Sequence, residues 1–357
     1  MKLRVDGLSV RFHLPGADVH AVTDARFELR AGQCLALVGE SGCGKSVMAH
    51  ALLGLLPGNS TVTGHAWLDD LPDAESARHR SDGLPGAGPG HARSDGPPGA
   101  GPGHARSDGP PGGEPGHARP AGLPGGESLD LVAAPEKVLA RRVRGRLIGL
   151  IPQSPAAHLT PVRTARAQLA ETLRELGRTG ETPDTLAERA GLRPRDLDRY
   201  PHQLSGGMAQ RVANALALAG DPPLILADEP TTGLDRPLVD ATMAELRRLC
   251  DEGRAVLVIT HDLRAAERVA DEIAVMYASR VVELSQAGPF FAGPRHPYAR
   301  GLLDALPSRR FVPIPGQPPE LTRLPDGCAF VPRCPLATPE CARQPAMNGK
   351  RVACHHA

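Results

Sequence analysis

The chain has 357 residues, which is the length of two domains or of one large domain with additions. Lysine and arginine number 41 against 40 aspartates and glutamates, so the net charge of +1 gives no sign of a nucleic-acid partner held by bulk charge. No run reaches the roughly 18 apolar residues of a membrane-spanning helix, and the amino terminus has no signal-peptide core. We therefore expect a cytosolic chain that reaches a membrane only through a partner.

Short apolar runs alternate with helical patterns, which predicts an α/β fold. Strands are expected at residues 34–38, 224–227 and 255–259. Continuous apolar runs of this kind are typical of parallel strands that are covered on both faces. Helices are expected at about residues 46–56, 164–176 and 237–249.

A Gly- and Pro-rich repeat of 13 residues interrupts this alternation at residues 80–118. So short a repeat has no apolar face to bury, and a solenoid would need longer units with periodic large apolar residues. We interpret residues 72–128 as a disordered insertion. From about residue 286 the chain becomes Pro-rich and irregular, which predicts one domain at 1–285 and a small second unit at 286–357.

The first strand is followed by a turn that fits the phosphate-binding pattern G-x-x-x-x-G-K-[ST]. Its residues are Gly39, Glu40, Ser41, Gly42, Cys43, Gly44, Lys45 and Ser46. Glycines let backbone N–H groups close around phosphates, and the start of the following helix favours negative charge. Lys45 supplies a charge near the β- and γ-phosphates, and the Ser46 hydroxyl can ligate Mg²⁺. Strand, motif and helix agree, so ATP and Mg²⁺ are the expected cofactors.

Polar residues follow the other predicted strands. Asp228 and Glu229 close one strand, where Asp228 can hold Mg²⁺ through water and Glu229 can polarise an attacking water. His261 follows the next strand, in reach of a γ-phosphate at the same sheet edge. Gln153 alone would be an ordinary loop residue. A solvated acidic pair is the alternative for Asp228 and Glu229, and Lys45 upstream makes it the weaker one.

A run found in few ATPases lies downstream of the phosphate loop. It reads Leu204, Ser205, Gly206, Gly207, Met208, Ala209, Gln210 and Arg211. With the motifs above, in this order, it resembles the signature of the ATP-binding cassette (ABC) family. The resemblance implies a P-loop NTPase cassette with a mixed sheet core and a helical signature subdomain at residues 153–211.

The same resemblance assigns roles to further residues. Gln153 would join Ser46 and Asp228 in binding Mg²⁺, and Glu229 and His261 would be the catalytic pair. Ser205, Gly206, Gly207 and Gln210 would close over ATP held by a second ATPase subunit, with Asp235 in the adjoining loop. Phe12, or otherwise His20, would stack on adenine.

Several short motifs resemble the dipeptide, oligopeptide and nickel branch of ABC importers. They are Tyr200-Pro201-His202-Gln203, Met208, His296-Pro297-Tyr298 and the runs 314–321 and 327–335. This implies an ATPase subunit on the cytoplasmic face of the membrane, paired with a copy of itself or a sister ATPase. Two transmembrane permeases and an extracytoplasmic solute-binding protein would complete it. Nickel or another solute, a non-transport ABC ATPase and an exporter are the alternatives.

The carboxyl-terminal unit contains four cysteines, Cys328, Cys334, Cys341 and Cys354. In a cytosolic chain such a group favours metal over disulfides. Structural zinc sites generally contain closely spaced cysteine pairs, which are missing here, whereas a [4Fe–4S] cluster tolerates this spacing. The importer resemblance also implies such a cluster, with unligated thiols as the alternative. His355 and His356 are expected to be no more than a terminal tail.

Overall fold

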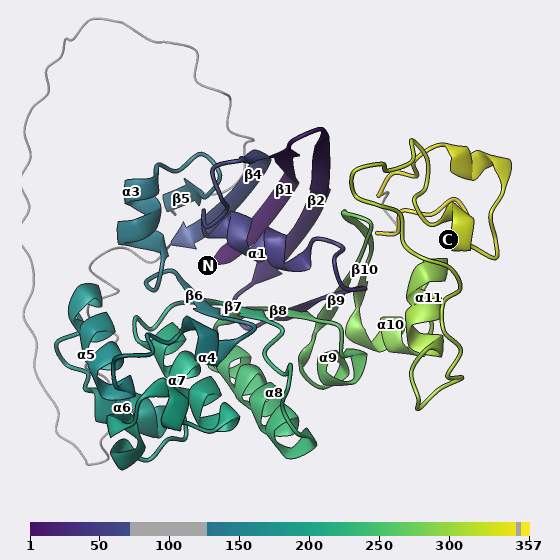
Figure 1. The fold of residues 1–357 in the computed structure, drawn as a ribbon. Helices are drawn as coiled ribbons and strands as arrows, with labels where there is room; N and C mark the ends of the chain where they lie inside the picture. The colour runs from purple at the N-terminus through teal and green to yellow at the C-terminus, as the bar shows by residue number, and fades with distance from the viewer. Residues whose placement is uncertain (72–126, 348–350) are drawn as a thin grey trace, which may run out of the picture. The chain divides into compact units, whose positions relative to one another are not determined.

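The computed structural model describes residues 1–71, 127–347 and 351–357, which belong to one compact unit (Figure 1). The repeat at residues 80–118 and its predicted disorder lie outside the described residues. The predicted insertion of 72–128 extends too far, because Glu127 and Ser128 already belong to a strand that pairs with Leu68 and Leu71.

Four antiparallel strands form the first sheet, in the order β2-β1-β4-β5. They are β1 (Lys2–Leu14), β2 (Ala17–Arg30), β4 (Ser60–Leu71) and β5 (Glu127–Asp130). In β1 the alternation of Leu3 and Val5 with polar neighbours buries one face, as expected for a sheet with one solvated side. The pairing shifts between Val5 and Leu8, so that Leu8 is buried as well.

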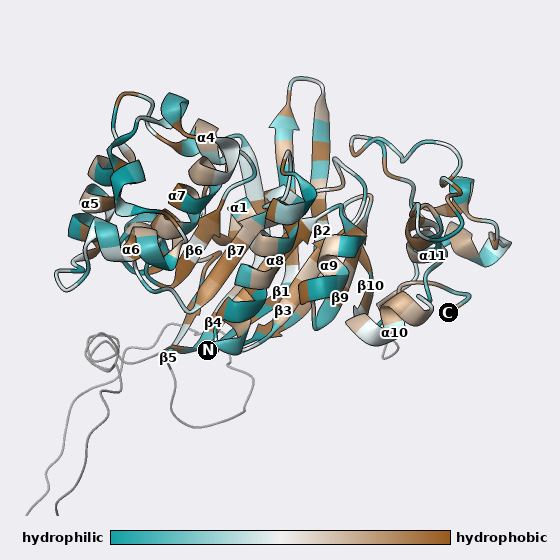
Figure 2. Cartoon of the chain, turned by 90° about the horizontal axis from the view of Figure 1, so that it is seen from below, coloured by the Kyte–Doolittle hydropathy of each residue, from teal (hydrophilic) through white to brown (hydrophobic). Residues whose placement is uncertain are grey.

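The second sheet has six strands in the order β10-β9-β3-β8-β7-β6. They are β3 (Cys34–Val38), β6 (Ile148–Ile151), β7 (Leu224–Asp228), β8 (Ala255–Thr260), β9 (Glu272–Tyr277) and β10 (Arg280–Gln286). All neighbours are parallel except β9 and β10. Every residue of β3, β7 and β8 is buried, which confirms the three predicted strands. The strands of this sheet are largely brown in Figure 2, the colour of hydrophobic residues.

Both faces of the six-stranded sheet are covered. Helix α1 (Lys45–Leu52) packs on one face with the antiparallel sheet, and α8 (Arg236–Asp251) and α9 (Leu263–Val269) cover the other (Figure 1). The predicted helices at 46–56 and 237–249 are therefore present. The first ends four residues early, because Leu53 caps it and Gly54 takes a φ of 61°.

Short helices between β6 and β7 form a separate apolar cluster. They are α4 (Pro155–His158), α5 (Ala165–Leu176), α6 (Pro183–Arg189), η2 (Pro194–Asp198), η3 (Pro201–Gln203) and α7 (Gly206–Leu218). The helix predicted at 164–176 is α5, and the Thr164 side chain caps it by accepting a hydrogen bond from the Ala167 N–H. A further short turn precedes β6, formed by α3 (Glu136–Val138) and η1 (Leu139–Val143).

The carboxyl-terminal segment packs against β3, β9 and β10, toward the β10 edge of the six-stranded sheet. Its elements are α10 (Ala287–Ala292), α11 (Pro297–Asp304), η4 (Val331–Arg333) and η5 (Pro339–Ala342). Phe290 and Tyr298 are fully buried against Tyr277 and its neighbours. The division of the chain at residue 285 stays a prediction, although residues on both sides share this core.

Replacing Leu246 of α8 by alanine should lower the free energy of unfolding by about 2–5 kcal/mol, because the side chain is fully packed under the sheet. Urea unfolding of the full-length chain measures the change. The control is Leu55→Ala, whose side chain is 47% exposed and should cost far less. Equal losses for the two variants would contradict the described core.

Candidate functional site

The loop between β3 and α1 follows a path that only glycine allows at two positions. Gly39 has a φ of 154° and Gly44 a φ of 107°, conformations that other residues rarely adopt. A Cβ atom on Gly39 would lie 2.2 Å from the carbonyl oxygen of Met276, and one on Gly44 would lie 1.9 Å from that of Ala21. The loop is therefore wedged against β9 and β2, and its backbone path is fixed.

A tight turn between β9 and β10 packs against the phosphate loop. Ala278 and Ser279 both have positive φ angles, 44° and 70°, an unfavourable conformation for residues with a Cβ. The Ser279 N–H donates to the Cys43 carbonyl (3.2 Å), and the Thr23 N–H donates to the Ser279 carbonyl (2.8 Å). Sequence reasoning missed this support, because the turn carries no Asn-Gly or Asp-Gly signal.

Lys45 begins α1 and points back into the loop. Its side chain is buried, and its Nζ donates to the carbonyl oxygens of Gly39 and Glu40, both at 2.9 Å. The ammonium charge is thus held at the centre of a glycine-rich turn, with the N-terminus of a helix beside it. A phosphate chain is the ligand that such a combination favours.

Two oxygen donors meet at the carboxyl edge of the six-stranded sheet. The Ser46 hydroxyl donates to Asp228 Oδ1 at 2.9 Å, although 182 residues separate them. Burial raises the pKa of the Asp228 carboxyl. A hydroxyl and a carboxylate of this kind suit Mg²⁺, which prefers hard oxygen ligands. Gln153 is exposed in the loop after β6, at the same edge of the parallel strands.

Glu229 and His261 lie together just beyond β7 and β8. Glu229 has a φ of 47° and its carboxylate is buried, a strained placement of the kind that clusters at functional sites. Its Oε2 lies 2.8 Å from His261 Nδ1 but is not aligned as a hydrogen bond, so this buried oxygen has no hydrogen-bond partner. An unsatisfied carboxylate oxygen can accept a hydrogen bond from a water molecule.

The signature residues do not complete this site within the chain. Ser205 is exposed and caps α7 by accepting from the Met208 N–H at 3.3 Å, and Gly206 beside it is exposed as well. Helix α7 packs into the helical cluster, whereas the phosphate loop and α1 belong to the sheet core. The start of α7 therefore presents free backbone donors to solvent.

The remaining sequence-predicted residues occupy varied environments. Gln210 is buried and donates to Asn214 at 3.1 Å. Asp235 is exposed and caps α8 by accepting from the Leu238 N–H. Phe12 is half-buried near the β1–β2 turn and packs against the sheet core, which leaves its role as the adenine platform a prediction.

The four carboxyl-terminal cysteines line one small hollow. His296, Phe330, His355 and His356 also line it. His356 Nε2 lies 3.1 Å from Thr338 Oγ1 and 3.5 Å from Cys341 Sγ, so the expectation that the last histidines are only a tail is wrong. Within the described parts of the chain, no three His, Cys, Asp or Glu side chains are grouped as a metal site. The four thiols therefore share one hollow without being grouped as metal ligands, and the iron–sulfur cluster stays a prediction.

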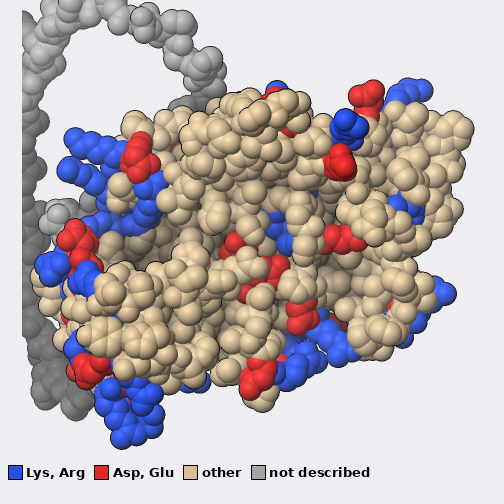
Figure 3. All heavy atoms as spheres, viewed as in Figure 1, with Lys and Arg blue, Asp and Glu red and all other residues tan. Residues whose placement is uncertain are grey.

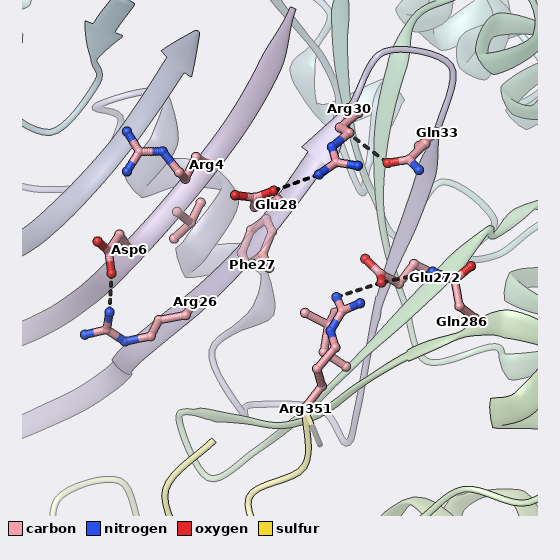
Figure 4. A pocket seen from close by; sticks show the side chains of 12 residues that line it. Arg4, Asp6, Arg26, Phe27, Glu28, Arg30, Gln33, Glu272, Gln286 and Arg351 are labelled. Atoms are coloured by element: carbon pink, nitrogen blue, oxygen red, sulfur yellow. Dashed lines mark hydrogen bonds and ion pairs between the residues drawn. The ribbon is translucent and has the colours of Figure 1, made fainter. Parts of the chain in front are cut away.

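A hollow of about 480 Å³ lies elsewhere, among β1, β2, β9 and β10 (Figure 4). Its walls are charged, but each charged side chain has an ion-pair partner. Three of the pairs are Arg26 with Asp6, Arg30 with Glu28, and Arg351 with Glu272. On the face drawn in Figure 3, basic and acidic side chains are interspersed. Neither surface has the one-sided charge of a phosphate or nucleic-acid site.

Two family comparisons match most of the described chain. Residues 22–84 and 130–232 match the family described as ABC transporter. Residues 282–341 match the family described as Oligopeptide/dipeptide transporter, C-terminal region. Together the fold, the phosphate loop and the sheet-edge carboxylates define an ABC ATP-binding cassette, which confirms the predicted cassette fold, whereas the Cys-rich extension stays a prediction.

Similarity to individual proteins shows more closely which branch of the ABC family the chain resembles. The chain is 34% identical to "Oligopeptide transport ATP-binding protein OppD" of Haemophilus influenzae, covering 97% of this chain and 93% of that protein. It is 34% identical to the Escherichia coli protein of the same name, covering 99% and 92%. The dimeric post-hydrolysis ATP-binding cassette MJ0796 has a TM-score of 0.56 at 22% identity, covering 80% of this chain and 98% of that one, and supports the fold alone. The chain belongs to the oligopeptide and dipeptide transporter family of ABC ATP-binding proteins.

Glu229→Gln should leave ATP binding intact and stop turnover, because the amide keeps the shape of the carboxylate but polarises water poorly. Equilibrium binding of a fluorescent ATP analogue and steady-state phosphate release measure the two effects. Unchanged hydrolysis in this variant would refute the catalytic role of Glu229.

Proposed function

We propose that this chain is the ATP-hydrolysing subunit that powers import of peptides through an ABC permease. The observation that carries the proposal is the meeting of Lys45, Ser46, Asp228 and Glu229 at one edge of the sheet. The names of its relatives, oligopeptide transport ATP-binding proteins, supply the cargo class.

Each residue at the sheet edge has a distinct part in hydrolysis. The N–H groups of the phosphate loop and Lys45 bind the β- and γ-phosphates of ATP. Ser46, Asp228 and Gln153 would hold Mg²⁺, which would neutralise charge on the phosphates. Glu229 accepts a hydrogen bond from the attacking water through its carboxylate, and His261, whose Nδ1 lies 2.8 Å from Glu229 Oε2, donates toward the γ-phosphate.

A second ATPase subunit completes the site. Ser205 and Gly206 stand exposed at the start of α7, with backbone donors free to meet a phosphate on another molecule. Gly207 allows close packing there, since a Cβ would already lie 3.0 Å from Leu238. ATP bound on one subunit is then enclosed by the signature of its partner, either a second copy or a sister ATPase.

Membrane partners are part of the same proposal. In the part of the chain that the structure describes, no helix combines the length and the apolar character needed to span a membrane. In the proposed transporter, two permease subunits provide the pathway, an extracytoplasmic solute-binding protein delivers the cargo, and this subunit binds the cytoplasmic face. The segment from Gln153 to the signature connects the ATP site to the helical cluster and transmits closure to the permease.

Substitutions at the two halves of the shared site should have different effects. Lys45→Ala should lose ATP binding, because the loop loses its charge. Ser205→Glu should keep ATP binding on the chain's own loop and lose hydrolysis, because its carboxylate repels the γ-phosphate on the partner. Binding of a fluorescent ATP analogue to the full-length chain and phosphate release by the purified ATPase pair measure both. Loss of ATP binding in Ser205→Glu would show that the signature belongs to the same chain's site.

We also propose that the thiols of Cys328, Cys334, Cys341 and Cys354 hold a [4Fe–4S] cluster. The support is that all four line one hollow, and four thiolates are the usual ligands of such a cluster. The cluster would link separate turns of a segment that has little regular structure.

Chain purified without oxygen should contain iron and inorganic sulfide, and Cys334→Ser should lose both. The control is Cys250→Ser, because that thiol is a buried residue of α8 and lies far from the hollow in the sequence. Metal analysis that finds zinc in place of iron, or neither metal, would contradict the cluster.

A further inference from the structure

Glu40, the second residue of the phosphate loop, is held by the carboxyl-terminal segment. Its two carboxylate oxygens accept hydrogen bonds from the two terminal nitrogens of Arg333, each at 2.8 Å. Its backbone N–H donates to the Tyr298 hydroxyl, also at 2.8 Å. Both partners are more than 250 residues away in the sequence.

Arg333 has a rigid setting of its own. Its side chain is only 3% exposed, its Nε donates to the Pro315 carbonyl at 2.9 Å, and its guanidinium lies over the rings of Tyr277 and Phe330. A guanidinium that forms two hydrogen bonds to one carboxylate and lies over aromatic rings is held in a single orientation. Glu40 raises the pKa of Arg333 further above its ordinary value, so the side chain keeps its charge.

Glu40 also contacts Lys45, the lysine of the phosphate loop. Its carbonyl oxygen accepts from Lys45 Nζ at 2.9 Å, its N–H is bound to Tyr298 and its carboxylate is bound to Arg333. Backbone and side chain of one residue are thus all fixed, two of the three by the carboxyl-terminal segment. If Glu40 lost these contacts and became mobile, the loop that positions Lys45 would become mobile as well.

We propose that Arg333 is a positioning residue of the ATP site, acting on the phosphate loop through Glu40. The carboxyl-terminal segment is then part of the nucleotide-binding machinery as well as an appended unit. The inference rests on the proposed function in one respect, that the loop binds ATP. Phosphate binding requires several loop N–H groups to converge, so a loosened loop binds ATP more weakly even though Arg333 itself touches no nucleotide.

A merely structural role for the salt bridge predicts something different. If Arg333 only attaches the carboxyl-terminal segment, its loss should lower the melting temperature and leave the affinity for ATP unchanged. Loss of one partner of a buried pair is destabilising in either case, so stability alone does not distinguish the two roles. The affinity for ATP does distinguish a positioning role of Arg333 from a merely structural one.

The test is titration of the full-length chain with a fluorescent ATP analogue and Mg²⁺. Arg333→Gln and Glu40→Gln should each raise the dissociation constant on the order of tenfold, as a displaced loop would. The double variant should be no weaker than either single one, because both changes break the same contact. Arg333→Lys should recover part of the loss, since it restores the charge without the two-pronged geometry.

Arg310→Gln is the matched control, because Arg310 lies in the same segment but makes an exposed ion pair with Asp304. It should bind ATP as the wild type does. If Arg333→Gln fails to fold, Glu40→Gln carries the same prediction with the arginine left in place.

Wild-type affinity in both Arg333→Gln and Glu40→Gln, with a lowered melting temperature, would overturn the inference. So would losses that add in the double variant. Failure of the wild type itself to bind ATP would instead contradict the proposed function, so the two failures are distinguishable.

Discussion

The close approach of the phosphate loop to strands β2 and β9 constrains the rest of the site. At Gly39 and Gly44 the backbone lies so near the carbonyls of Met276 and Ala21 that no side chain fits between them. The strained turn at Ser279 contacts the loop on a third side, where the Ser279 N–H donates a hydrogen bond to the Cys43 carbonyl. A loop held on three sides keeps its N–H groups converging before any ligand arrives, which is the preorganisation that phosphate binding requires.

Strand order places the other groups around that loop. Because β3, β8, β7 and β6 run parallel, the residues that follow each of them meet at one edge of the sheet. Ser46 reaches Asp228 across this edge, and His261 reaches Glu229. Residues far apart in the sequence, such as Ser46 and Asp228 at a separation of 182 positions, therefore belong to one site, while Ser205 is exposed at the start of α7.

Local sequence patterns predicted much of this arrangement. The strands at 34–38, 224–228 and 255–260 are short buried apolar runs, and their period and boundaries are visible in the sequence. Residues next to those strands, such as Lys45 and Asp228, could be assigned because the motif fixes their position relative to the strand.

Local sequence patterns could not predict the long-range contacts. The pairing of Arg333 with Glu40 spans 293 residues, and neither residue has a local neighbour that signals it. Ser279 has an ordinary sequence context, and its positive φ follows only from the packing of the hairpin under the loop. No periodic pattern surrounds His356, so the sequence predicts only a tail there, yet the fold brings it to the cysteine hollow. The predicted end of α1 was four residues too late, because the apolar pattern continues beyond Leu52 into the capping turn.

The central claim is that ATP hydrolysis by this subunit drives peptides across a membrane. The most direct measurement is accumulation of a radiolabelled oligopeptide in vesicles that contain the assembled transporter and its solute-binding protein, with ATP or a non-hydrolysable analogue supplied to this subunit. The account predicts accumulation with ATP and none with the analogue. Equal accumulation with both nucleotides, or hydrolysis that moves nickel ions and no peptide, would contradict it.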